Sequence, residues 1–326
     1  MSSRREFLRA AALSAAAAKI GMGAVAGQQR TLAGLFPIAF SPFTPDNKLD
    51  LDGLAAEVKF CNRGGVHGIV WPQLASAWNT LSDAERMDGT EAMLAAGKGG
   101  RTAIVIGVQG PDLATVTKYS KLATRLGADA IISLPPNGVT DEKALLDYYK
   151  KVGATTDLPM FAQFVGSMSV DLMVEMFRTI PNFRYVKDEA GEPLDRVAEI
   201  RKRTGDQVKV FSGKGVQTMM TEMERGFSGH CPYTNLADVY AQTYDLFHEG
   251  KRREAFDMFG RVLAMGSMMP VNTIDVMIAR GVFKEDTRTR NGPHVPGAPT
   301  KKPAITLTHE QVREKLQTYL GPWLRA

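Results

Sequence analysis

Short apolar runs alternate with helical patterns along most of this chain, and this alternation limits its fold more than any other feature. The runs are nearly continuous, which is typical of parallel strands that are covered on both faces. The segments between them are long enough for crossover helices. We expect strands at residues 36–40, 68–71, 103–108, 130–134, 160–164, 184–186, 208–211 and 227–231. Eight repeats predict an α/β fold, a (β/α)8 TIM barrel, although an open sheet of about six strands remains an alternative on the pattern alone.

Local signals support the helices of this pattern. Ser82 followed by Glu85 predicts a capping box at a helix start. Gly127 and Gly205 are expected to end helices in the left-handed conformation. A single buried stripe is predicted on the first helix from residues spaced i, i+3, i+4 and i+7, namely Leu51, Leu54, Ala55 and Val58.

The mature chain is predicted to be one domain of two parts. The hydrophobic fraction of 44% and the charged fraction of 23% are ordinary for a globular protein, and no linker interrupts the middle of the chain. We assign residues 30–235 to the barrel and residues 236–326 to a C-terminal helical extension. Within the extension, residues 286–303 form a basic connection rich in Pro and Gly before a last helix at 309–320.

The N-terminus resembles an export signal. Arg4 and Arg5 precede an Ala-rich stretch at residues 10–18, and small residues end at Ala26. Residues 1–26 therefore predict a twin-arginine signal peptide, with the twin-arginine translocase as a partner during export and a periplasmic location. The apolar stretch is too short and too weakly hydrophobic for a stable membrane span. The alternative is an amphipathic helix of the folded domain.

Charge and metal-ligand patterns exclude several classes of function. The formal net charge is +5, but residues 1–26 carry four basic residues and one acidic residue, a net of +3, which leaves only +2 for the rest. This balance argues against nucleic acid as a partner. Cys61 and Cys231 are expected to be buried free thiols. The histidines are isolated in the sequence, so no metal site is expected, and most of them are expected at the surface or rim; they are His67, His230, His248, His294 and His309.

Lys187 is the main candidate for catalysis, because it ends the sixth predicted strand. Functional groups of such barrels lie at the carboxyl ends of the strands. A partly desolvated lysine there can form a Schiff base with a ketone. The alternative is a charge partner of Asp188 or Glu189, of which only one can face the pocket, since adjacent residues near a strand end point in opposite directions.

An ordered set of segments resembles the dihydrodipicolinate synthase and N-acetylneuraminate lyase family. The segment Val-Lys-Asp-Glu-Ala-Gly at residues 186–191 resembles the surroundings of the Schiff-base lysine in that family. Further matches lie in order at residues 37–43, 64–70, 81–86, 127–130, 212–213 and 226–229. The resemblance implies a (β/α)8 barrel with a helical extension, frequently a homotetramer, and lyase or dehydratase chemistry on 2-oxo acids through Lys187.

This chain departs from the family at other positions of the site. Gln-Leu-Ala-Ser-Ala at residues 73–77 stands where the family has Gly-Thr-Thr-Gly-Glu, so both hydroxyl donors to the substrate carboxylate are missing. Gln163 stands where the family has a proton-relaying Tyr, and an amide cannot act as an acid or base near neutral pH. Met168 replaces a substrate-binding Arg, and Asn137 or Gly138 replaces an aromatic pair.

Two hypotheses follow. The first is a divergent Schiff-base lyase of aldolase or dehydratase type that acts on a 2-oxo acid or sugar-acid-like substrate, without a metal or organic cofactor. Its proton shuttle would be Tyr233, Ser212 or a bound water. Its substrate would meet Gln73, Ala75, Ser76, Trp78, Asn137, Gln163, Ser212 and Lys214. The second is a non-catalytic or repurposed extracytoplasmic barrel that binds a small molecule, since a fold alone does not prove activity.

Overall fold

The computed structural model describes residues 31–269, 271–290 and 306–326. The chain divides into residues 1–32, of which only the last two are described, and the unit Ala33–Ala326, to which the following description refers. The predicted signal peptide, the greater part of the connection at 286–303, and His294 lie outside the described residues.

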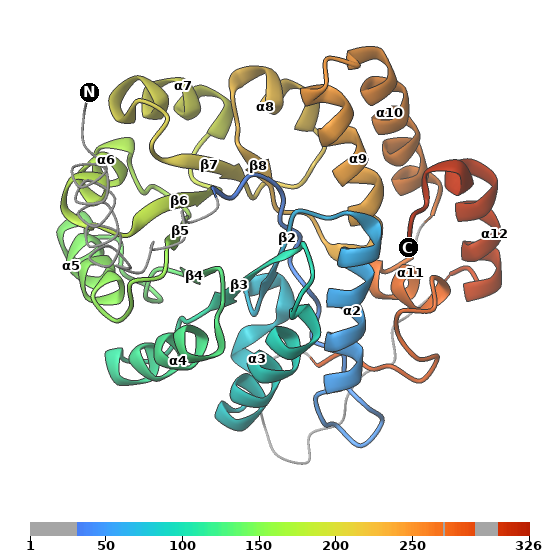
Figure 1. Cartoon of the computed structure of the whole chain (residues 1–326), viewed down its shortest axis with the longest axis horizontal. Coiled ribbons are helices and arrows are strands. Elements are labelled where there is room, and N and C mark those ends of the chain that lie inside the picture. Colours follow the sequence, from blue (N-terminus) through green and yellow to red (C-terminus); the bar gives the residue numbers. More distant parts are fainter. Residues whose placement is uncertain (1–30, 270, 291–305) are drawn as a thin grey trace, which may run out of the picture. The chain divides into compact units, whose positions relative to one another are not determined.

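Eight parallel strands form the sheet, in the order β1-β8-β7-β6-β5-β4-β3-β2. The two edge strands, β1 and β2, are joined through Ile38, which follows β1 and forms a bridge to Val70 of β2. Ile38 also forms a bridge to Tyr233, which follows β8. The Val70 amide also donates to the Pro37 carbonyl at 2.9 Å. Helices surround the strands (Figure 1), so the fold is the predicted (β/α)8 barrel rather than an open sheet. The strands are β1 Gly34–Leu35, β2 Gly68–Trp71, β3 Ala103–Gly107, β4 Ala130–Ser133, β5 Met160–Phe164, β6 Phe183–Asp188, β7 Lys209–Ser212 and β8 Gly229–His230.

The prediction for the first strand was wrong in its bounds. It ends at Leu35, before the predicted residues 36–40 begin. Residues 36–40 are extended, but their amides bond alternately to the two neighbouring strands: Phe36 donates to the His230 carbonyl at 2.9 Å, and Ala39 donates to the Val70 carbonyl at 3.0 Å. Pro37 has no amide to donate. This segment therefore closes the barrel through single bridges instead of a continuous ladder.

Seven helices cover the barrel: α2 Leu51–Gly64, α3 Asp83–Gly97, α4 Leu113–Leu126, α5 Glu142–Gly153, α6 Val170–Thr179, α7 Pro193–Thr204 and α8 Met219–Arg225. The capping box is confirmed, since the Ser82 hydroxyl accepts from the Glu85 amide at 3.2 Å and the Glu85 carboxylate accepts from the Ser82 amide at 2.8 Å. Gly127 and Gly205 end their helices with φ of 80° and 59°, as predicted. Leu51 does not join the buried stripe of α2, because at the first position of the helix it is 38% exposed.

The C-terminal extension is helical, as predicted. It contains α9 Ala237–His248, α10 Arg252–Met268, α11 Thr273–Ala279 and α12 His309–Leu320. Single 3-10 turns lie at Thr234–Leu236 and Gly321–Trp323, and two more, Leu74–Ser76 and Trp78–Thr80, follow β2. Helices α9 and α10 pack together beside α2 (Figure 1). No helix in the described ranges is long and apolar enough to span a membrane.

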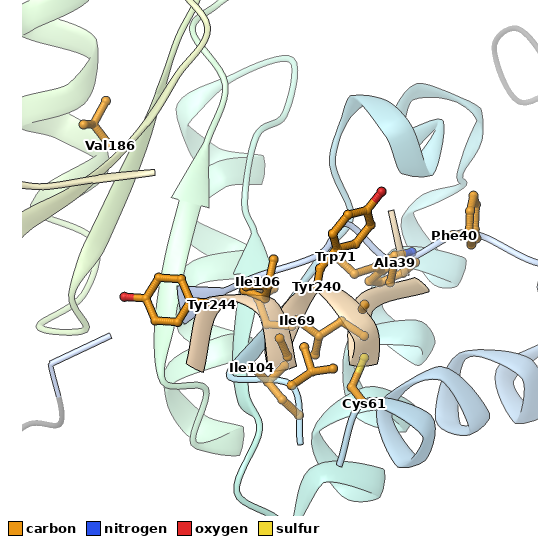
Figure 2. Close-up of a cluster of buried hydrophobic side chains, with 14 of the residues drawn as sticks. Ala39, Phe40, Cys61, Ile69, Trp71, Ile104, Ile106, Val186, Tyr240 and Tyr244 are labelled. Atoms are coloured by element: carbon orange, nitrogen blue, oxygen red, sulfur yellow. The ribbon is translucent and has the colours of Figure 1, made fainter. Parts of the chain in front are cut away.

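Alternation along the strands divides the buried side chains into two sets. One set faces the helices, as Figure 2 shows for Ile69, Ile104 and Ile106, which gather beside Cys61 and Tyr240. The other set fills the barrel interior with aromatic rings from β5, β6, β7 and the segment after β1. The Phe161 ring stacks on Tyr185 with centroids 4.4 Å apart, and the Phe36 ring meets Phe211 edge-on with centroids 5.1 Å apart. Aromatic side chains therefore fill the lower interior of the barrel, so polar groups that could act on a ligand are expected at its mouth, at the carboxyl ends of the strands.

Candidate active site

Lys187 points into the mouth of the barrel. On β6, Asp188 faces the helices, because its carboxylate accepts from Arg196 of α7 at 3.0 Å. Successive residues of a strand point to opposite faces, so Tyr185 and Lys187 both face the interior. Tyr185 belongs to the aromatic layer, and Lys187 lies one step closer to the carboxyl end of the strand. Its side chain is only 5% exposed.

Glu189 is the charge partner of Lys187. The Lys187 Nζ atom lies 2.8 Å from Glu189 Oε1, and Gln163 donates its amide to Glu189 Oε2 at 3.0 Å. The carboxylate occupies space left open by Gly213, where a Cβ would come within 2.4 Å of Glu189 Oε1. Of the two acids that follow Lys187, only Glu189 reaches the pocket, as expected. Burial raises the pKa of the other, Asp188, even though Arg196 opposes that shift.

A second polar cluster lies above β2 and β3. Gln73 is fully buried and donates to Gln109 Oε1 at 3.1 Å, and Gln109 donates to the Pro72 carbonyl at 2.8 Å. Gly107 makes room for both amides, since a Cβ there would come within 3.0 Å of Gln73 Nε2 and 3.1 Å of Gln109 Oε1. Gln109 was missed at the sequence level, although it follows the third apolar run just as Lys187 follows the sixth. The same criterion could have found it.

The segment that replaces the carboxylate-binding turn is tied to the first strand region. The Ser76 hydroxyl donates to the Ala39 carbonyl at 2.6 Å and accepts from the Gln73 amide at 3.1 Å. Ser41 in turn donates to the Ser76 carbonyl at 2.7 Å. The Ser76 hydroxyl is therefore engaged within the protein. Ala75 beside it is half-buried and offers no polar side-chain atom.

A cavity of about 830 Å³ opens at the carboxyl ends of β2 to β5. Its wall includes Trp78, Asn137, Met168 and Gln109, so two of the positions that differ from the family face this space. Leu74, Pro135, Pro136, Tyr148 and Val165 give much of the wall an apolar character. A largely apolar wall with few polar groups is typical of a small-molecule site. Gln109 connects the cavity to the buried Gln73.

Three other candidates are placed away from the Lys187 amine. Ser212 faces the helix layer, where its hydroxyl donates to Glu222 Oε1 of α8 at 2.8 Å. Lys214 is exposed at the rim and donates to the Gly191 carbonyl. Tyr233 is exposed at the end of β8, and its ring stacks on Phe40 with centroids 5.3 Å apart. The structure thus groups Lys187 with Gln163 and Glu189, and Gln73 with Gln109.

The histidines do not all lie at the surface. His230 is fully buried and is an exception to the surface or rim positions expected for most histidines. Its side chain faces α8, where its Nε2 atom lies 3.0 Å from Glu222 Oε2. Among the residues that the structure describes, no group of three His, Cys, Asp or Glu side chains could hold a metal ion. Both cysteines are free and buried, as predicted, and burial raises the pKa of Cys231 to about 12.

These features define a (β/α)8 barrel with a desolvated, acid-paired lysine at the carboxyl end of its strands. A model of the dihydrodipicolinate synthetase family matches residues 31–313, which are most of the chain, so the chain belongs to this family. This confirms the family resemblance seen in the sequence.

Curated relatives are distant. A 4-hydroxy-tetrahydrodipicolinate synthase from Methanosarcina mazei is 28% identical over 193 residues, which cover 57% of this chain and 65% of the relative. The chain therefore spans slightly less than two thirds of the length of that protein. An uncharacterised DapA-like lyase from Thermococcus kodakarensis is 25% identical over 294 residues, which cover 86% of this chain and 96% of the relative.

Solved structures share the fold at lower identity. A catalytic-lysine mutant of the sialic acid aldolase from Ruminococcus gnavus matches with a TM-score of 0.77 at 15% identity, covering 90% of this chain and 98% of the other. The N-acetylneuraminate lyase from Mycoplasma synoviae matches with a TM-score of 0.72 at 18% identity and the same coverage. At these identities the likeness shows the fold alone.

Proposed function

We propose that this protein is a Schiff-base-forming lyase of aldolase or dehydratase type, with Lys187 as the nucleophile. The observation that carries the proposal is the Lys187 amine, which is buried in the barrel mouth 2.8 Å from a carboxylate oxygen. Membership of a family that contains such lyases supports it. The substrate is a small carbonyl compound, and the family suggests a 2-oxo acid or a sugar-acid-like molecule. The reaction needs no metal or organic cofactor in this proposal.

Glu189 takes the part of proton shuttle, in place of the Tyr233, Ser212 or water considered from the sequence. Lys187 must lose a proton before its lone pair can add to a carbonyl carbon, and Glu189 Oε1 is within reach to accept that proton. After addition, the carbonyl oxygen takes one proton from the attached nitrogen and a second from Glu189, and it leaves as water, which gives an iminium ion. That cation withdraws electrons from the neighbouring carbon, so a carbon–carbon or carbon–oxygen bond one atom away can break.

The alternative is a barrel that binds a small molecule without turnover. The Lys187–Glu189 contact fits this alternative as well, because a buried ion pair of this kind also occurs as a purely structural feature. The two functions differ in one observable property, which is a covalent bond to Lys187.

Borohydride trapping tests the proposal. Purified protein that lacks residues 1–26 is incubated with a panel of 2-oxo acids, sugar acids, aldehydes and ketones, then reduced, and its intact mass is measured. We expect a mass increase equal to one reduced ligand, lost in Lys187→Ala and retained in Lys121→Ala, a matched exposed lysine of α4. If the wild-type protein forms no adduct with any carbonyl, the lyase proposal fails and the binding barrel remains.

We also propose that residues 1–26 direct export by the twin-arginine route to the periplasm, and that the mature protein is a homo-oligomer, with a tetramer suggested by the family resemblance. The paired Arg4 and Arg5 support the first point. Replacing both with Lys should retain the protein in the cytoplasm, which fractionation of a producing bacterium measures. Light scattering of the purified mature protein tests the second point, and a monomer would contradict it.

A further inference from the structure

The orientation of the Gln73 amide follows from its neighbours. The Pro72 carbonyl can only accept, so Gln109 must direct its Nε2 at it, at 2.8 Å. The Gln109 oxygen is then left to accept from Gln73 Nε2 at 3.1 Å. Gln73 Oε1 is consequently the free end of this chain of hydrogen bonds. It is buried and has no hydrogen-bond partner in the part of the protein that is described.

Gln163 is oriented by the same reasoning. An ionised carboxylate only accepts, so Gln163 directs its Nε2 at Glu189 Oε2, at 3.0 Å. Gln163 Oε1 is then free, and within the described ranges this buried oxygen also has no partner. Its side chain is fully buried. An unpaired buried acceptor costs about 1–3 kcal/mol, so two such groups at the mouth of one barrel call for an explanation.

Both oxygens belong to the mouth of the barrel interior. Gln163 lies two residues beyond Phe161 on β5 and opposite Lys187 of β6, so its side chain shares the interior face with the lysine. The Gln73 amide lies over Gly107 of β3. Gly107 also faces the interior, because Ile104, on the alternate face of β3, packs against Gly97 of α3. The two free acceptors therefore lie on the interior side of the barrel mouth, the side to which Lys187 also points.

We propose that the ligand of this site is an uncharged hydroxy-carbonyl compound whose hydroxyl groups donate to Gln73 Oε1 and Gln163 Oε1, and not a 2-oxo acid. This inference rests on the proposed function, in which Lys187 bonds the carbonyl carbon. A carboxylate next to the carbonyl can only accept hydrogen bonds, so it would find no donor in Gln73 Oε1 or Gln163 Oε1. It would also meet Glu189, whose charge balances that of Lys187.

The buried arginine behind the site does not change this conclusion. Arg86 of α3 directs its guanidinium at the carbonyl oxygens of Gln109 and Gly107, at 2.9 and 2.7 Å. Each of its two terminal nitrogens thus donates to the backbone below the amides. Residues 73–77 lack the hydroxyl donors of the family, and the glutamines add acceptors. Both changes disfavour a carboxylate ligand and favour a polyhydroxy aldehyde or ketone.

Three ketones that differ in one group test the inference. Hydroxyacetone, acetone and pyruvate share a methyl ketone and carry a hydroxymethyl, methyl or carboxylate group beside it. The rate of borohydride-trapped adduct at Lys187 is measured for each and divided by its rate with free Nα-acetyl-lysine, which removes the difference in intrinsic reactivity. We expect hydroxyacetone to exceed acetone by about 5–10-fold, from one gained hydrogen bond, and acetone to exceed pyruvate.

Length-matched variants assign the preference to the two amides. The single hydroxyl of hydroxyacetone can donate to only one of the two oxygens, so Gln73→Met or Gln163→Met should reduce the hydroxyacetone preference over acetone to less than about 2-fold. Gln207→Met, an exposed glutamine at the opposite end of the barrel before β7, should leave it unchanged. Circular dichroism and a thermal melt of every variant distinguish a lost preference from a lost fold.

The outcomes separate the two proposals. If pyruvate gives the largest normalised rate, or if neither glutamine variant changes the preference, the inference is wrong and the Schiff-base lyase stands. If no ketone bonds to Lys187, the proposed function fails, and saturation-transfer NMR of the same three ligands then decides the inference by itself. Stronger saturation of hydroxyacetone that falls in Gln73→Met supports it, and stronger saturation of pyruvate or equal saturation of all three overturns it.

Discussion

Buried ion pairs lie both in the C-terminal extension and in the barrel mouth. In the extension, Arg280 binds Asp238 of α9 through two parallel hydrogen bonds of 2.8 and 2.7 Å, and the two side chains are 3% and 0% exposed. Arg280 also donates to the Asn235 carbonyl at 3.0 Å, and Asp238 accepts from the Arg325 amide at 2.9 Å. Each charged group therefore has several partners in a fixed geometry.

The pair in the barrel mouth is built differently. Lys187 and Glu189 make a single contact of 2.8 Å, and Glu189 is 23% exposed. The amide of Gln163 that supports the carboxylate keeps a free oxygen. We conclude that a buried pair whose hydrogen bonds are all satisfied holds the fold together, whereas a pair at the barrel mouth next to an unpaired amide oxygen is suited to receive a ligand.

The largest effect is expected from breaking the saturated pair. Arg280→Met leaves Asp238 buried without its bidentate partner, so the free energy of unfolding should fall by about 3–5 kcal/mol. Urea denaturation at neutral pH measures this loss. Lys251→Met is the matched control, since Lys251 pairs with Glu249 in solvent at 2.9 Å and should leave stability nearly unchanged. A loss below about 1 kcal/mol for Arg280→Met would remove the distinction between the pairs.

A third buried acid, Glu57 of α2, sharpens the comparison, because it has hydrogen bonds but forms no ion pair with a basic group among the residues that the structure describes. It accepts from the Phe40 amide at 3.2 Å and from the Thr234 hydroxyl at 2.5 Å. Burial raises the pKa of Glu57 to about 8 from 4.5. The folded state therefore binds this proton more tightly than the unfolded chain, so the contribution of Glu57 to stability is complete below pH 4.5 and is lost as the pH rises through 8.

Glu57→Gln keeps the acceptor and removes the titration. The unfolding free energy of the variant minus that of the wild type should rise with pH, by at most about 1.4 kcal/mol per pH unit, between pH 5 and 8. Parallel urea titrations across that range measure the difference. A difference that is flat with pH would mean that Glu57 is ionised in the folded protein and has a charge partner after all.

The smallest effect on stability is expected at the catalytic candidate. Lys187→Met leaves Glu189 with partial access to water and with its bond to Gln163, so the free energy of unfolding should fall by only about 1–2 kcal/mol. The same urea titration provides the measurement. A loss as large as that of Arg280→Met would show that Lys187 is a structural charge partner, and the contrast between the two regions would be lost.

Much of the barrel could be predicted from residue patterns. Seven of the eight predicted strands overlap those observed. The helices that follow Ser82 and Thr308 begin at the predicted residues. The first strand could not be placed correctly, because residues 36–40 form alternate bridges to two strands that are distant in sequence. Lys187 could be singled out by its place near a strand end. Its partner could not be chosen between Asp188 and Glu189 until α7 supplied Arg196 to one of them.

The sequence by itself determined the alternation of strands and helices, the family, and the positions at which this chain departs from it, since these depend on local periodicity and residue identity. Tertiary structure alone decided which polar groups remain without partners. Gln73 and Gln163 have a free oxygen because Gln109 and Glu189 take their amide hydrogens, and each partner arrives from a different strand end. Hydrogen-bond satisfaction is a property of three-dimensional neighbours, and no spacing along the chain encodes it.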